Sequence, residues 1–214
     1  MQVNCVFCGA MSENAYIVRA DDAHECIVID PGEAKPVLER LAQDGLQCTH
    51  ILITHGHFDH IAGAAALARE TGAKVCIHEA DAEKLASNRK SLAYLFAQQI
   101  EPIAADVLLH DGDELDAAGL SIRALHTPGH SEGGVCYLIE AERTIFCGDT
   151  LFYESVGRTD FPGCSQDALL SSIREKLLSL QGDYTLYCGH GMKTSLAHER
   201  ACNPFIGESV GTAW

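Results

Sequence analysis

The chain has 214 residues, of which 47% are hydrophobic and 21% are charged, and its formal net charge is −15. No apolar run approaches the roughly 20 residues of a membrane helix, and the strong negative charge repels the phosphate backbones of nucleic acids. Length and composition are typical of one globular domain of a layered fold. We therefore expect a single domain over residues 1–214, as a monomer or homo-oligomer, that binds neither nucleic acid nor a membrane.

Strands and helices are predicted from the alternating and the helical spacing of apolar residues. Strand candidates at 134–140 and 143–147 form a hairpin pattern, which indicates antiparallel pairing in each half of the chain. Runs of strands with helices between them predict a mixed α/β fold of two packed sheets covered outside by helices. In chain order, the predicted strands are 2–7, 14–19, 25–29, 49–54, 74–78, 106–109, 120–125, 134–140, 143–147 and 184–187, and the predicted helices are 34–44, 61–71, 80–99 with an interruption near Ser87, 166–180 and 194–202.

The N-terminal segment lacks the basic and apolar stretches of a secretion signal, so a cytoplasmic location is expected. The ten cysteines lie mostly in apolar strand-like runs, where a reduced thiol behaves as a small hydrophobic group. Cys5 and Cys8 have the spacing of metal ligands, but the sequence has no second pair to complete a structural zinc site. The cysteines are therefore expected to be free thiols.

A histidine-rich segment, THGHFDH at 54–60, directly follows an apolar strand candidate. His55 and His57 are two residues apart and can reach one cation from an extended turn, while Asp59 and His60 can reach a second. Imidazole and carboxylate groups are preferred ligands of Zn²⁺ and Fe²⁺, whereas surface turns more often use Gly, Asn, Asp and Ser. We interpret the segment as a metal-binding loop that needs further ligands from other strand ends.

Three further candidate ligands also follow apolar strand candidates. His130 comes after a Thr-Pro-Gly turn, Asp149 follows Phe-Cys-Gly, and His190 stands between two glycines that allow close backbone approach. Two neighbours have open roles. Asp30 could accept a hydrogen bond from a ligating histidine or could cap its own turn, and His126 could support His130 from the same strand end.

These motifs together resemble the metallo-β-lactamase fold superfamily. The resemblance rests on THGHFDH at 54–60, on His130 after Thr-Pro-Gly, on Gly-Asp at 148–149 and on Gly-His-Gly at 189–191. The chain is most similar to the small glyoxalase II-like hydrolases, through GDTLF at 148–152, GRTDFPG at 157–163, Glu-Arg at 199–200 and Asn-Pro-Phe at 203–205. The resemblance implies a four-layer αββα sandwich without the C-terminal helical domain of larger glyoxalase II enzymes.

The resemblance also implies a ligand set and a reaction. Two divalent cations are implied, zinc first, with iron or manganese as alternatives because histidine and carboxylate ligands suit all three. A bridging hydroxide, oriented by Asp59, would attack the carbonyl of a small-molecule thioester such as S-lactoylglutathione. The implied ligands are His55, His57 and His130 for one cation, Asp59, His60 and His190 for the other, and Asp149 as the bridge.

Two positions bear on substrate binding. Larger glyoxalase II enzymes have a lysine where this chain has Arg158 and a tyrosine where it has Met192. Arg158 keeps the positive charge and could bind an anionic part of the substrate, or it could tie its own loop to Asp160. Met192 cannot donate the hydrogen bond of the tyrosine, so recognition of glutathione at this position is expected to differ.

Two other functions stay open. The Gly-Arg-Thr-Asp-Phe run at 157–161 also resembles mononuclear iron persulfide dioxygenases, which use the positions of His55, His130 and Asp149 but usually lack the Gly-His-Gly pattern. A non-catalytic metal-binding member is the second alternative. Oxygen uptake with one iron per chain would favour the dioxygenase, and bound metal without hydrolysis of thioesters, lactones or β-lactams would favour the non-catalytic protein.

Overall fold

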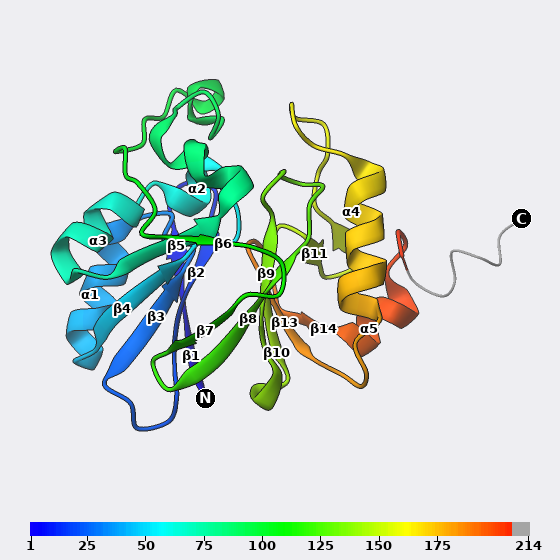
Figure 1. Cartoon of the computed structure of the whole chain (residues 1–214), viewed down its shortest axis with the longest axis horizontal. Coiled ribbons are helices and arrows are strands. Elements are labelled where there is room, and N and C mark those ends of the chain that lie inside the picture. The colour runs from blue at the N-terminus through cyan, green and yellow to red at the C-terminus, as the bar shows by residue number, and fades with distance from the viewer. Residues whose placement is uncertain (207–214) are drawn as a thin grey trace, which may run out of the picture.

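Two β-sheets face each other in the computed structural model, which describes residues 1–206 (Figure 1). The first sheet has the strand order β1-β2-β3-β4-β5-β6, and the second has the order β14-β13-β10-β9-β8-β7. The strands of the first sheet are β1 (Gln2–Cys8), β2 (Glu13–Arg19), β3 (Glu25–Ile29), β4 (Gln47–Leu52), β5 (Lys74–His78) and β6 (Val107–Leu109). Those of the second are β7 (Glu114–Ala117), β8 (Leu120–His126), β9 (Val135–Ile139), β10 (Thr144–Gly148), β13 (Thr185–Cys188) and β14 (Thr194–Ser195), and β11 (Leu151–Phe152) pairs separately with β12 (Ser155–Val156).

Helices cover the outer side of each sheet, at the left and the right of Figure 1. On the first sheet lie α1 (Ala34–Asp44) and α3 (Ala64–Thr71), and on the second lie α4 (Gln166–Ser172) and α5 (Leu196–Cys202). The short helix α2 (Phe58–Ile61) stands at one edge of the first sheet. None of the helices within residues 1–206 combines the length and apolarity that a bilayer crossing requires.

Three apolar layers hold these four layers of secondary structure together. Leu41 of α1 and Leu67 of α3 belong to the layer outside the first sheet. Tyr137 and Phe146 belong to the layer between the sheets, and Leu169 of α4 belongs to the layer outside the second sheet. Each strand presents alternate side chains to opposite faces, so a sheet buried on both sides needs apolar residues throughout, as β9 has with all five residues buried. The predicted αββα sandwich is confirmed.

The pairing of strands is mixed within each sheet. The predicted hairpin is confirmed, since β9 and β10 pair antiparallel, and β1, β2 and β3 are antiparallel as well. From β3 to β6 the strands instead run parallel, and so do β10 and β13. The expectation of antiparallel pairing in each half is therefore correct only in part, because connections through α1 and α3 return the chain to the same edge before each new strand.

Two predicted helices differ from the observed elements. Residues 80–99 form no continuous α-helix but two 3₁₀ segments, η1 (Glu79–Ala86) and η2 (Ala93–Phe96). Between them the Asn88 side chain accepts a hydrogen bond from the Ile100 N–H, and Leu92 has a left-handed φ of 65°. Such side-chain bonds to the backbone compete with helix formation. The predicted helix 166–180 begins as α4 and continues as a wider π-helical segment, η4 (Ile173–Leu178).

Candidate metal centre

The candidate site lies where strands of the two sheets end. β3 and β4 are parallel and end next to Asp30 and to the 54–60 loop. β8 and β10 are both antiparallel to β9, so they run in one direction, and β13 is parallel to β10. His130, Asp149 and His190 therefore follow strand ends at one edge of the second sheet. The observed topology brings the predicted ligands of both sheets to the same place.

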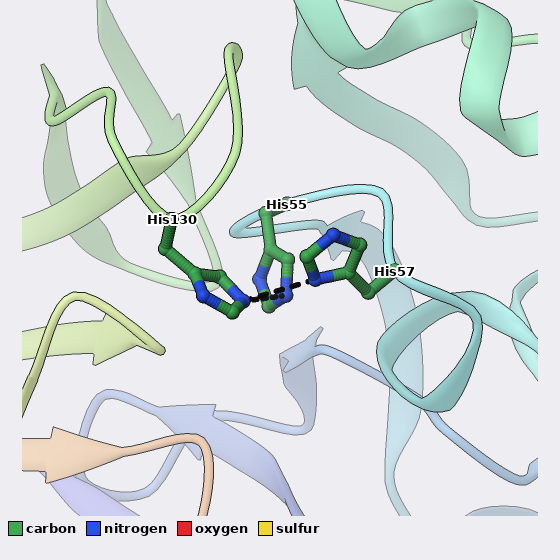
Figure 2. A group of neighbouring side chains, drawn as sticks. All are labelled: His55, His57 and His130. Atoms are coloured by element: carbon green, nitrogen blue, oxygen red, sulfur yellow. Dashed lines mark hydrogen bonds between the residues drawn. The ribbon is translucent and has the colours of Figure 1, made fainter. Parts of the chain in front are cut away.

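His55, His57 and His130 form the first ligand group, and Figure 2 shows their rings turned toward one point. His57 Nδ1 lies 2.9 Å from His130 Nε2, which lies 3.2 Å from His55 Nε2. All three residues are buried. Nitrogens that ligate one tetrahedral cation at about 2.0–2.1 Å lie about 3.3 Å apart, so this group has the dimensions of a metal site.

Hydrogen bonds fix which nitrogen faces the site in two of the three rings, those of His130 and His55, whereas His57 faces it with Nδ1. His130 Nδ1–H donates to the Arg158 carbonyl at 2.8 Å, and His55 Nδ1 lies 3.1 Å from Thr54 Oγ1, so each ring presents Nε2. Burial and the neighbouring histidines lower the pKa of His55 well below its usual range and that of His57 to about 3. At neutral pH these two rings are therefore uncharged and offer lone pairs to a cation.

Asp59, His60 and His190 form the second ligand group. The Asp59 carboxylate lies 3.3 Å from His190 Nε2 and 4.0 Å from His60 Nε2. The two groups meet at Asp149. One of its oxygens is 3.4 Å from His60 Nε2, and the other is 3.6 Å from His130 Nε2 and 3.7 Å from His190 Nε2. The structure thus brings together all seven predicted ligands, with Asp149 between the two groups, and its role as a bridge stays a prediction.

Two buried atoms at the centre of this cluster have no hydrogen-bond partner among the described residues, namely His60 Nε2 and Asp149 Oδ1. A buried acceptor without a partner costs about 1–3 kcal/mol, and a bound cation would satisfy it. The backbone approaches this carboxylate closely at Gly189, since a Cβ added there would meet Asp149 Oδ1 at 2.3 Å. The donor set and the space fit two divalent cations.

The charges around the second ligand group are strongly coupled. Burial lowers the pKa of His60, but the carboxylates of Asp149 and Asp59 outweigh it and hold that pKa well above its usual range. Conversely, burial raises the pKa of Asp149, and His60 with the other histidines outweighs this and lowers it. Protons and cations therefore compete for the same carboxylates, and cation binding here is expected to weaken in acid.

Asp30 supports the second group from behind. Its carboxylate accepts a hydrogen bond from His60 Nδ1–H at 3.0 Å, which leaves Nε2 facing Asp149, and it also accepts from the Thr54 N–H at 2.7 Å. Of the two roles considered for Asp30, the contact to a ligating histidine is therefore the observed one. Asp30 has a left-handed φ of 49°, a conformation held by these buried bonds. His126 does not reach His130 and instead stacks on His78.

Glu13 and Asn14 belong to the site although the sequence offered no sign of it. Both Glu13 oxygens are buried without a partner among the described residues, one of them 3.9 Å from His60 Nδ1, and burial raises the pKa of this carboxyl well above its usual range. The Asn14 side chain donates to the Cys188 and Gly191 carbonyls at 3.0 Å each. β2 of the first sheet thereby fixes the loop that carries His190.

Asp81 is a third residue of the site that the sequence did not indicate. It is fully buried beyond the end of β5 and accepts from the Gly56 N–H at 2.7 Å, the Gly133 N–H at 2.8 Å and the Ser131 hydroxyl. Lys84 completes the cluster with an ion pair of 2.7 Å. One carboxylate therefore joins the 54–60 loop to the loop that carries His130.

We expect Asp81→Asn to lower the free energy of unfolding by about 3 kcal/mol, because either amide orientation places an NH₂ group against a buried N–H donor. Burial raises the pKa of Asp81, but Lys84 and the hydrogen bonds outweigh this and lower it. A carboxyl whose pKa is lowered by folding stabilises the protein above its unfolded pKa of about 3.9 and loses that contribution as the pH falls through its folded pKa. Urea unfolding should therefore show a constant difference between wild type and variant near neutral pH and a shrinking one below about pH 4.

Asp44→Asn is the matched control for this measurement. Asp44 also pairs with a basic side chain one turn away, Arg40 at 2.6 Å, but on the surface, where such a pair contributes about 0.3–0.5 kcal/mol. Equal losses in the two variants would contradict the role given to Asp81.

A cavity of about 360 Å³ opens over the ligands. Arg158 lines it, yet its guanidinium makes two hydrogen bonds of 2.7 Å to the Asp160 carboxylate and lies 4.1 Å from the centre of the Phe161 ring. Met192 is 64% exposed and does not line this cavity, whose wall instead includes Met11. The loop contact considered for Arg158 is thus observed, and its contact with substrate stays a prediction, as does that of Met192.

The model of the metallo-β-lactamase superfamily matches residues 8–190, a range that contains all seven ligands. The chain is 34% identical over 200 residues to the probable metallo-hydrolase YqgX of Bacillus subtilis, and the aligned region covers 92% of this chain and 94% of that protein. It is 31% identical over 218 residues to the hydroxyacylglutathione hydrolase GloC of Haemophilus influenzae, with 96% and 98% covered.

Solved structures give the same picture. The BLEG-1 B3 metallo-β-lactamase superposes with a TM-score of 0.91 at 33% identity, over 96% of this chain and 99% of that one. A protein solved in a di-iron-bound form has a TM-score of 0.84 at 35% identity, over 95% and 100%. ETHE1 from Myxococcus xanthus has a TM-score of 0.79 at 29% identity, over 95% and 84%.

Proposed function

Because the chain belongs to the metallo-β-lactamase superfamily, we propose that it is a metal-dependent hydrolase that uses two divalent cations to cleave a small-molecule thioester. One observation carries the proposal: Asp149 stands between two complete ligand groups, with oxygens 3.4 Å from His60 Nε2 and 3.6 Å from His130 Nε2. The likeness to a hydroxyacylglutathione hydrolase at 31% identity over 96% of this chain supports the thioester as substrate class.

When bound, two such cations polarise a carbonyl and lower the pKa of a water between them. In the hydrolysis, the water oxygen forms a bond to the carbonyl carbon, the carbon–sulfur bond breaks, and its electron pair leaves with the sulfur, so the products are a carboxylic acid and a thiol. Asp59 lines the cavity, and although burial raises its pKa, the nearby histidines lower it overall. Asp59 is therefore ionised at neutral pH and can accept a hydrogen bond that orients the attacking water.

Zinc is the proposed cation, and iron is the first alternative, because a relative of 35% identity was solved in a di-iron-bound form. The dioxygenase alternative is supported by the structural likeness to ETHE1. The complete Asp59, His60 and His190 group favours the hydrolase, since a mononuclear site leaves these ligands unused. The ten free cysteines support a reducing, cytoplasmic location, and the net charge of −15 argues against nucleic acid as a partner.

The test is elemental analysis of protein purified without added metal, combined with assays of S-lactoylglutathione hydrolysis and of oxygen uptake with glutathione persulfide. Two equivalents of zinc, iron or manganese per chain with thioester hydrolysis would support the proposal. One iron with oxygen uptake would overturn it in favour of the dioxygenase. Bound metal without turnover of thioesters, lactones or β-lactams would overturn it in favour of a non-catalytic protein.

The part of Arg158 in binding an anionic thioester can be tested through its partner. The hydrogen bonds from Arg158 lower the pKa of Asp160 to about 2, so this carboxylate is ionised at physiological pH. We expect Asp160→Asn to lower the KM for S-lactoylglutathione by about two- to fivefold, because it frees a guanidinium at the cavity wall, and Arg158→Ala to raise the KM by a similar factor.

Steady-state kinetics at low and high salt would measure both effects, which should shrink as salt screens the charge. Asp111→Asn is the control, since it frees Lys176 from an exposed pair of 2.6 Å that does not line this cavity. An unchanged KM in both Asp160→Asn and Arg158→Ala would mean that Arg158 serves its loop alone.

A further inference from the structure

The cavity over the ligands continues into a second one. The second cavity has a volume of about 280 Å³ and shares four residues with the first, namely Met11, Phe58, Asp59 and Phe96. Beyond the shared wall it runs past the turn between β1 and β2 and past two neutral amides, Gln98 and Gln99. The two cavities therefore lie side by side, and together they are called the groove.

The wall shared by the two cavities is apolar and well supported. The rings of Phe58 and Phe96 pack with their centres 4.9 Å apart, and the Phe58 backbone N–H donates to the Ser91 carbonyl at 2.9 Å. Phe58 is nearly buried, but Phe96 is 39% exposed and Met11 is 46% exposed. Large apolar side chains with this exposure at the rim of a site are typical of ligand contacts.

Within residues 1–206, the second cavity offers no positive side chain to an anionic occupant. Among the described residues that line either cavity, Arg158 is the sole lysine or arginine, and it lines the first cavity alone, where it pairs with Asp160. A carboxylate placed in the second cavity would find no lysine or arginine among these residues, whereas an apolar chain needs none.

We propose that the groove binds the unbranched, apolar arm of a thioester substrate, which runs over Phe96 and Met11 from the first cavity into the second. The inference rests on the proposed thioester hydrolase function and names its substrate class. The arm belongs either to the acyl group or to the thiol, because both diverge from the same carbonyl, and the experiment below distinguishes the two.

The first measurement is kcat/KM for two series of uncharged thioesters. One series carries acetyl, butanoyl, hexanoyl and octanoyl groups on N-acetylcysteamine, and the other carries an acetyl group on thiols of the same chain lengths. Each methylene that enters the groove should raise kcat/KM by about threefold until the second cavity is filled. A rise in the acyl series identifies an acyl arm, and a rise in the thiol series identifies a thiol arm.

The second measurement uses variants of the same short segment. Phe96→Ala should reduce kcat/KM for the octanoyl thioester about tenfold more than that for the acetyl thioester. Tyr94→Ala is the matched control, because Tyr94 is a 53% exposed aromatic residue of η2 that lines neither cavity. Competitive inhibition by octanoate relative to acetate gives a binding readout that does not depend on turnover, and Phe96→Ala should reduce this preference as well.

Failure of the inference can be distinguished from failure of the proposed function. If both series are hydrolysed at rates that do not depend on chain length, or if Phe96→Ala and Tyr94→Ala have equal effects, the apolar groove is overturned while the hydrolase stands. If the metal-loaded protein hydrolyses no thioester of any kind, the proposed function itself fails.

Discussion

Asp149→Ala is expected to abolish hydrolysis, with a loss of at least about a thousandfold in kcat/KM, and to reduce the bound metal of the purified protein. The carboxylate faces both ligand groups at 3.4–3.7 Å, so its removal weakens both cation sites at once. Loss of a supporting residue behind a ligand already lowers metal affinity by about 10–100-fold, and loss of a shared ligand should exceed that. Elemental analysis and thioester kinetics on the same preparation would measure both effects.

Asp44→Ala is the control for handling and folding, because Asp44 lies on the surface in a pair with Arg40. The fold of Asp149→Ala should be checked by its circular dichroism. A variant that keeps two cations and at least half of the wild-type activity would show that Asp149 is not the bridge between the groups.

Asp59→Ala is expected to lower kcat by about a hundredfold while one cation stays bound. Asp59 contributes to the second ligand group, 3.3 Å from His190 Nε2, whereas the first group consists of His55, His57 and His130 without it. The change removes both a ligand and the acceptor that orients the attacking water. The measurements are kcat at saturating substrate and the metal content after dialysis.

The two roles of Asp59 can be separated by loading the variant with excess metal. If activity returns when two cations are restored, Asp59 acts as a ligand alone. If activity stays low with two cations bound, the orienting role is supported. Full activity of Asp59→Ala without added metal would contradict both roles.

The layered fold could be predicted because its cause is local. Apolar runs such as those of β4 and β9 are short and bounded by turns, and helices such as α1 end at a glycine with a left-handed φ. The segment 80–99 could not be predicted correctly, because its composition favours a helix while a distant bond from Ile100 to Asn88 breaks it. Strands of two residues, such as β11, carry no periodicity to detect.

The clustering of the seven candidate ligands could be predicted because the segments that carry them follow strands, and histidine or aspartate at that place has few structural uses. The residues that support the candidate ligands could not be predicted from the sequence. The Asp81 carboxylate accepts hydrogen bonds from the backbone N–H groups of Gly56 and Gly133, which are 25 and 52 positions away in the chain. Glu13 opens a strand and gives no local sign that it will be buried beside His60. Such contacts follow from how the sheets face each other, which spacing does not encode.

The division of the ligands between the two sheets links cofactor loading to the cohesion of the molecule. His55, His57, Asp59 and His60 come from the first sheet, while His130, Asp149 and His190 come from the second. Each ligand group takes members from both sides, so neither half of the chain holds a complete site alone. A ligand that binds the native state alone adds its binding free energy to that of folding. Cations in this site would therefore hold the two halves together, and the free energy of unfolding would depend on how much metal is available in the cell.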